Sequence, residues 1–347
     1  MFSRNEVRYA IGVAGMTLGA GVSAHHSTAN FDTRQTVEFR ATVTKFEFNN
    51  PHSHLYLERA SPEGVKEQWL VELPSVPAMR STGITSRDKF KPGDVITFRG
   101  SPDRDPKKKY VTFNRITKED GTVFGREQDA SQRTAQTPKG PGSSDFTGTW
   151  SLMGWIPEGG TRAFFDPVSY SVTQKGKTVL AEYAEEKDPV LNCEKHGLPR
   201  SIYGVYPRSI TRKGNNLEFH YEYMDVLRTI HMDQKSHPAN APRSHIGHSI
   251  GRMEGNILVI ETANFSAQRW GNGRGLDSSD QKQLVERYTM GPDGHTMKVT
   301  FTLTDPVYLT QPVVETFSFS YSPEYKISDF NCDVDSAKTY LNVGAQK

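Results

Sequence analysis

Short runs in which apolar and polar residues alternate fill most of this chain, and they constrain the fold more than any other feature. Between residues 37 and 124, five runs are divided by turn residues; they read VEFRATVTKFEF, HLYLER, EQWLVEL, DVITFRG and KYVTFNRI. Alternation with a period of two buries one face of a strand and exposes the other. A helix-like segment at residues 75–89 follows the third run. This order predicts a small OB-like β-barrel.

The same alternation continues from residue 146 to the end of the chain. We expect about eight to ten antiparallel strands there, the run SYSVTQKGKTVLAEY among them, by count of such runs. Gly176, Gly214, Gly255 and Gly294 fall between runs, where hairpin turns need them. A Gly-x-Trp at Trp150 resembles the opening of lipocalin-like barrels. The chain is therefore predicted to be mostly β, with the larger part an antiparallel lipocalin-like β-barrel or sandwich.

Composition divides the chain into four parts. Residues 1–24 have the charged start, short apolar run and small-residue end of a signal peptide, with cleavage expected after Ala24. We therefore expect a periplasmic or secreted protein of bacterial type without a further membrane span. Residues 25–125 form the first β domain, and residues 146–347 the second. Between them, residues 126–145 are rich in Pro, Gly, Ser and Gln, as flexible linkers are.

Charge and cysteine content limit the kinds of binding partner and the cross-links that this chain can have. The chain has 42 Lys and Arg against 40 Asp and Glu, and these charges are interspersed, which excludes a nucleic-acid groove or a polybasic membrane anchor. A small molecule, a metal or another protein is the expected partner, and the oligomeric state is open. The only cysteines, Cys193 and Cys332, would pair as a disulfide in an oxidising compartment, the alternative being two buried thiols.

The chemistry-bearing residues concentrate in residues 228–265, where four histidines occur. His231 and Asp233 would face the same side of one strand, so the carboxylate would fix the tautomer of the imidazole and raise its basicity. Other histidines would assist, and an arginine would receive an anionic or carbonyl oxygen. The candidate catalytic residues are His231, Asp233, His237, His248, Arg252 and Glu254.

Three functions remain open for this region. It can be a cofactor-independent acid/base enzyme of the isomerase, lyase or hydrolase type, or a non-catalytic site for a small apolar or aromatic molecule. Its charged residues can also have a purely structural role, because charged side chains at strand ends often stabilise hairpins in β proteins. Serine-hydrolase, zinc-protease, phosphate-loop and dinucleotide motifs do not occur, so those chemistries are poorly supported.

A copper site is the alternative outside this region. Cleavage after Ala24 would give His25 a free amine beside its imidazole, and the alternating His52 and His54 would present two more imidazoles on one strand face. Nitrogen ligands of this kind suit Cu(II). The other interpretation is a frayed terminus and strand-end histidines bonded to backbone.

Several motifs together resemble a widespread group of secreted bacterial proteins of unknown function. They are the Ala24-His25-His26 start, the Asn-Pro-His before Ser53, and the later run GHSIGRMEGNILVIETANF. The resemblance implies a two-domain architecture and brings no activity with it. Met253 stands where the relatives carry Trp, which is a departure from their pattern.

Overall fold

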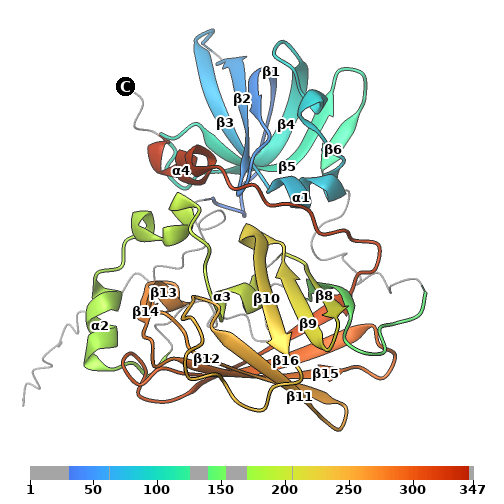
Figure 1. Cartoon of the computed structure of the whole chain (residues 1–347). Coiled ribbons are helices and arrows are strands. Elements are labelled where there is room, and N and C mark those ends of the chain that lie inside the picture. Colours follow the sequence, from blue (N-terminus) through green and yellow to red (C-terminus); the bar gives the residue numbers. More distant parts are fainter. Residues whose placement is uncertain (1–30, 62, 126–139, 154–169, 205, 344–347) are drawn as a thin grey trace, which may run out of the picture.

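The computed structural model describes residues 31–61, 63–125, 140–153, 170–204 and 206–343. Two β-barrels make up most of these residues, the smaller one lying on the larger (Figure 1). The predicted signal peptide and most of the predicted linker lie outside the described residues. Within the described ranges, no helix combines the length and the apolar character needed to cross a membrane.

The small barrel contains the five predicted strands. Each has two neighbours in the order β3-β2-β1-β4-β5, and a parallel pairing of β3 with β5 closes the ring. A short helix begins after Ser75, whose side chain accepts a hydrogen bond from the backbone of Ala78, and the turn that follows ends at Gly83 with φ 87°. The strand order and the helix after the third strand agree with the predicted small barrel. The elements are β1 (Val37–Glu47), β2 (Ser53–Ala60), β3 (Lys66–Leu73), α1 (Val76–Met79), β4 (Val95–Pro102), β5 (Tyr110–Lys118) and β6 (Val123–Gly125).

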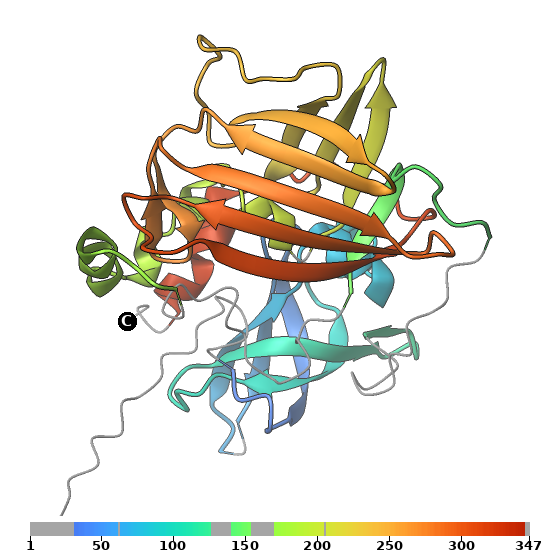
Figure 2. The same ribbon diagram turned by 90° about the horizontal axis from the view of Figure 1, so that it is seen from below.

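The large barrel is closed, so the barrel prediction is confirmed over the sandwich. The pairing order within the described residues is β10-β11-β12-β15-β16-β17-β7-β8-β9, and Figure 2 shows the orange strands side by side across one face. One junction departs from the antiparallel prediction, because β10 and β11 pair in parallel. The strands are β7 (Gly148–Leu152), β8 (Arg208–Lys213), β9 (Asn216–Tyr221), β10 (Val226–His231), β11 (His248–Glu254), β12 (Ile257–Ala263), β15 (Gln283–Met290), β16 (Thr296–Thr304) and β17 (Val313–Tyr321).

One predicted strand region is helical instead. Residues 174–181, within the run around Gly176, form α2 (Gln174–Ala181). The hydroxyl of Thr173 accepts a hydrogen bond from the backbone of Gly176, which is the contact of a helix N-cap. The N-cap and the polar segment QKGKT favour a helix here, although the residues on either side alternate as in a strand. The other described elements of this half are α3 (Arg200–Tyr203), the hairpin β13 (Gln268–Gly273) with β14 (Leu276–Ser278), and α4 (Val334–Asn342).

The C-terminal segment ties the two barrels together. Its helix α4 lies between them in Figure 1. The backbone of Asp333 donates to the carbonyl of Asn50 at 2.7 Å, and the side chain of Asn50 donates to the carbonyl of Phe330. The predicted disulfide between Cys193 and Cys332 is present and anchors the same segment to the large barrel. Residues far apart in sequence therefore meet where the barrels touch.

A buried ion pair crosses the interior of the large barrel. The guanidinium of Arg228 on β10 binds the carboxylate of Glu286 on β15, and both side chains are almost fully buried, at 1% and 0% exposure. Ser249 and Thr262 accept further hydrogen bonds from Arg228 at 2.9 and 2.7 Å, while the Tyr288 hydroxyl donates to Glu286 at 2.6 Å. Burial of two charges is tolerated only when such bonds replace water.

We expect Glu286→Gln to lower the free energy of unfolding by roughly 3–5 kcal/mol, because it leaves the charge of Arg228 buried without a counter-charge. Urea unfolding monitored by circular dichroism measures this change. The matched control is Glu261→Gln on the adjacent strand β12, whose carboxylate pairs with Arg252 at the surface. That control should cost about 1 kcal/mol or less. Equal losses for the two variants would contradict the prediction.

Candidate functional site

Three of the predicted catalytic histidines meet at one end of the β10–β11 pair. The rings of His231 and His248 stack with centroids 4.7 Å apart and planes 9° apart. The ring of His237 meets that of His248 edge-on, and their Nδ1 atoms are 3.0 Å apart, a hydrogen-bond distance. His248 therefore contacts both of the other imidazoles. We call His231, His237 and His248 the histidine cluster.

The parallel strand pair explains why these histidines come together. His231 is the last residue of β10 and His248 is the first residue of β11. The register of Ile230 with Ser249 and of His231 with Ile250 places the end of β10 beside the start of β11. The connection between the strands returns His237 to the same end. Since this parallel register covers two residue pairs, the hydrogen bond from Arg228 to Ser249 reinforces a short seam.

The environment of His237 and of His248 favours the uncharged form of their imidazoles. Burial lowers the pKa of His237, although the nearby carboxylate of Glu261 opposes this. Burial also lowers the pKa of His248, and the two neighbouring histidines lower it further. All three rings are only partly buried, so solvent reaches the cluster. Neutral imidazoles offer one donor and one acceptor nitrogen each, and can therefore give and take protons.

The predicted pairing of His231 with Asp233 is wrong in its placement. The strand β10 ends at His231, and Asp233 lies in the bend that follows, exposed to solvent. Within the described residues, no hydrogen bond or ion pair joins the two side chains. The prediction extended the strand alternation beyond its last paired residue, so the partner of His231 is another imidazole.

Arg252 and Glu254 do not reach the histidine cluster either. Arg252 on β11 binds Glu254 at 2.8 Å and Glu261 at 2.5 Å, and Glu254 also binds Arg287 at 2.8 Å. All of these lie on the solvent side of the barrel wall. The carboxylates raise the pKa of Arg252, and the arginines lower the pKa of Glu254, so both stay charged. They form a surface ion-pair network, which matches the structural alternative.

His52 and His54 lie where the small barrel touches the C-terminal segment. His54 on β2 is buried, and desolvation lowers its pKa to about 4, so its imidazole is neutral. His52 lies just before β2 and its Nδ1 is 3.8 Å from a carboxylate oxygen of Glu72. Over the described ranges, no set of three His, Cys, Asp or Glu side chains is arranged to hold a metal ion. His25 lies outside those ranges, so the copper site stays a prediction.

Glu72 is a buried acid that the sequence analysis missed. It pairs with His54 across the β2–β3 ladder, so both side chains share a face, and it accepts a hydrogen bond from the hydroxyl of Tyr110. Desolvation raises its pKa to about 8. The available signal was a lone acid inside the apolar run LVEL, at a position where alternation alone predicts exposure. A protonated carboxyl group therefore lies among the junction histidines at neutral pH.

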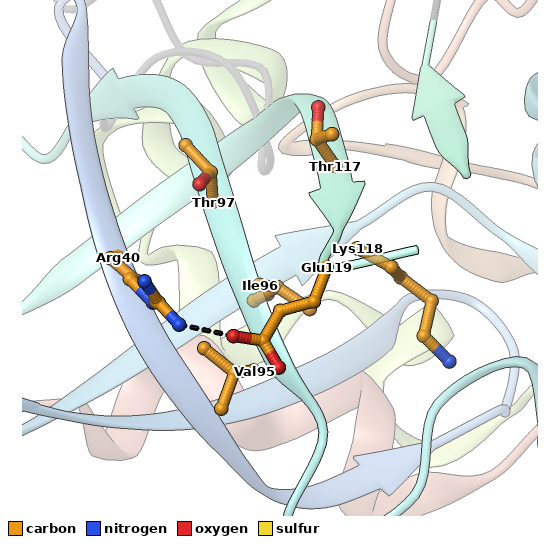
Figure 3. Close-up of a pocket in the computed structure, with 7 residues that line it drawn as sticks. All are labelled: Arg40, Val95, Ile96, Thr97, Thr117, Lys118 and Glu119. Atoms are coloured by element: carbon orange, nitrogen blue, oxygen red, sulfur yellow. Dashed lines mark hydrogen bonds and ion pairs between the residues drawn. The ribbon is translucent and has the colours of Figure 1, made fainter. Parts of the chain in front are cut away.

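A small hollow of about 270 Å³ lies on the small barrel, away from both histidine sites. Arg40 and Glu119 meet across it as an ion pair above Val95 (Figure 3). These two charged side chains are more than half exposed. Ion pairs of this kind contribute little and hold no proton-transfer group. The histidine cluster therefore remains the candidate site.

The buried acid makes stability depend on pH in a defined direction. The folded state keeps a proton on Glu72 up to about pH 8, whereas an unfolded glutamate loses it near 4.5. Folded protein then binds more protons than unfolded protein, so this contribution to stability falls as pH rises from about 4.5 to 8. We expect Glu72→Gln to remove that fall and to be more stable than the wild type by about 1–3 kcal/mol at pH 8.

The control for this prediction is Glu58→Gln on β2, whose partly exposed carboxylate has a pKa that the hydrogen bond from Lys66 already lowers. The carboxylate of Glu58 titrates below pH 5 in both the folded and the unfolded state. The variant should therefore keep the wild-type dependence of stability on pH between pH 5 and 8. Urea unfolding at several pH values gives both slopes. A Glu72→Gln slope equal to that of the wild type would overturn the assignment of a neutral buried acid.

Comparison with protein families finds one match. Residues 14–112 match a family of unknown function, DUF6152. The match covers β1 to β4 and the start of β5, and thus most of the small barrel, without reaching the histidine cluster. It agrees with the resemblance to an uncharacterised group and names no activity. No curated protein matches the chain.

Solved structures similar to the chain include two barrels of unrelated sequence. One is a secretary abundant heat soluble protein from Ramazzottius varieornatus, at 12% identity, with 52% of this chain and 97% of that chain covered and a TM-score of 0.26. The other is a variant of the fluorescent protein UnaG, at 14% identity, covering 52% and 98%, with a TM-score of 0.25. Scores this low carry no functional argument, so the assignment of the barrel depends on its strand pairing.

Proposed function

We propose that the large barrel binds a small organic molecule at the histidine cluster and transfers a proton there. The observation that carries this proposal is the position of His248, which stacks on His231 and has its Nδ1 at hydrogen-bond distance, 3.0 Å, from the Nδ1 of His237. The export signal predicted at residues 1–24 would place this activity outside the cytoplasm.

The shared proton gives the cluster its chemistry. When one Nδ1 donates to the other, the donating ring has an unprotonated Nε2 and the accepting ring has a protonated one. If the first ring takes a substrate proton at its Nε2 and passes its Nδ1 proton to the second ring, and the second ring releases its Nε2 proton to the substrate, both rings stay neutral and their roles are exchanged. One imidazole is then a general base and the other a general acid, which is the pair that isomerases and lyases need. No cofactor enters this scheme. The roles first predicted for Asp233, Arg252 and Glu254 are not part of it.

The experiment uses 5-nitrobenzisoxazole, a small aromatic compound whose ring opens when a base removes its C–H proton. We expect the wild type to accelerate ring opening and His248→Ala to lose roughly 10–100-fold of that acceleration, because the base and its relay are both removed. The rate should rise with pH and then reach a plateau. Because the pKa of His248 is lowered, the midpoint of this rise should lie below 6.5, the ordinary pKa of histidine. Absorbance of the phenolate product measures the rate.

The matched control is His220→Ala, since His220 lies on β9 of the same barrel and pairs with Asp225 at 3.5 Å, apart from the cluster. It should keep the wild-type rate. Titrating the wild type with the same compound separates catalysis from the alternative of simple binding. Saturable binding of the compound without ring opening would show a binding protein. A His248→Ala rate equal to that of the wild type would refute the proposal.

A further inference from the structure

A second arginine inside the large barrel has no counter-charge among the described residues. Arg208, the first residue of β8, is 2% exposed. Its guanidinium lies over the ring of Phe319 at 4.1 Å and near the ring of Tyr221 at 5.4 Å. Both rings belong to the barrel core. Among the described residues, no carboxylate lies within ion-pair distance of this guanidinium.

The hydrogen bonds of Arg208 do not satisfy its donors. Its two terminal nitrogens donate to the backbone carbonyls of Ile202 and Gly204, which lie at the C-terminal end of α3. Its Nε is buried and has no hydrogen-bond partner in the part of the chain that the structure describes. A guanidinium carries five N–H donors, and neutral carbonyls compensate its charge only in part. Burial accordingly lowers the pKa of Arg208.

The acid whose charge acts on Arg208 is already engaged. Glu286 lies close enough to act on Arg208 through its charge, but its two oxygens accept hydrogen bonds from Arg228 and Tyr288. The described part of the barrel interior therefore holds two buried guanidiniums near one carboxylate, and that carboxylate binds Arg228. A buried charge without a partner costs several kcal/mol, which an anion from outside the chain would offset.

We propose that the large barrel takes up an organic anion and that Arg208 holds its anionic group. The aromatic neighbours of Arg208 select an apolar, planar body for that anion, such as an aromatic carboxylate. The carboxylate would replace the carbonyls of residues 202 and 204 as the acceptor, because charge-assisted bonds to a guanidinium are the stronger ones.

This site is separate from the histidine cluster. Arg208 pairs with Tyr221, and Tyr221 pairs with Val226 at the start of β10. His231 is the last residue of that same strand. The two sites therefore lie at opposite ends of β10, and a variant at one leaves the residues of the other in place.

The test compares naphthalene-2-carboxylate with naphthalene-2-carboxamide, a neutral compound of the same shape, by isothermal titration calorimetry. We expect the wild type to bind the carboxylate at least about tenfold more tightly than the amide. Arg208→Gln should lose that preference. Arg212→Gln is the matched control, since Arg212 is exposed on the same strand and pairs with Asp145. Absence of saturable carboxylate binding by the wild type would overturn the proposal, as would an unchanged preference in Arg208→Gln.

A second measurement distinguishes a ligand site from a purely structural arginine. If Arg208 is kept for an anion, Arg208→Gln removes an uncompensated charge, and the melting temperature without ligand should rise by a few degrees. The carboxylate should raise the melting temperature of the wild type but not that of the variant. If the arginine only caps α3, the variant melts lower and the carboxylate shifts neither protein, which would also overturn the proposal.

Discussion

The buried pair of Arg228 and Glu286 is the interaction on which the large barrel and its histidines both depend. It joins β10 to β15 through the interior, and the hydrogen bond from Arg228 to Ser249 adds β11. The seam between β10 and β11 is short and parallel, and parallel pairing is slightly less stable per residue than antiparallel pairing. A polar network in the core therefore holds together the strands that the backbone ladder holds least.

The position of this network also sets the geometry of the histidine cluster. Arg228 lies three residues before His231 on β10, and Ser249 directly follows His248 on β11. Fixing the first pair of residues fixes the strand ends that carry the two rings. The register of β10 with β11 places the two imidazoles side by side, and no feature of the local sequence indicates that register. Catalytic and binding groups need such positioning by residues that are themselves locked.

Titratable groups are concentrated in two further places, each with a different electrostatic balance. At the contact between the barrels, Glu72 is neutral because burial outweighs its hydrogen bond from Tyr110. Inside the large barrel, Arg228 remains charged because Glu286 compensates it, whereas Arg208 has no carboxylate of its own among the described residues. The difference between these arginines is one of partners and not of burial, and it is the reason to look for a ligand beside only one of them.

The amino-acid sequence by itself determined the mostly β class, the two-part order of strands, the hairpin at Gly255 and the region in which the histidines gather. Period-two alternation and turn residues are local properties, so a single chain displays them. The disulfide partners also followed from the sequence, since it offers only two cysteines.

Only the tertiary structure decided which histidines meet, and with what. Local alternation paired His231 with Asp233, but the strand ends before the acid, and the register of β10 with β11 brings His248 instead. The tertiary structure likewise decided that Arg252 and Glu254 face solvent while Arg228 and Glu72 are buried. Contacts between residues far apart in the chain set burial and strand direction, and those long-range contacts decide which charges have partners.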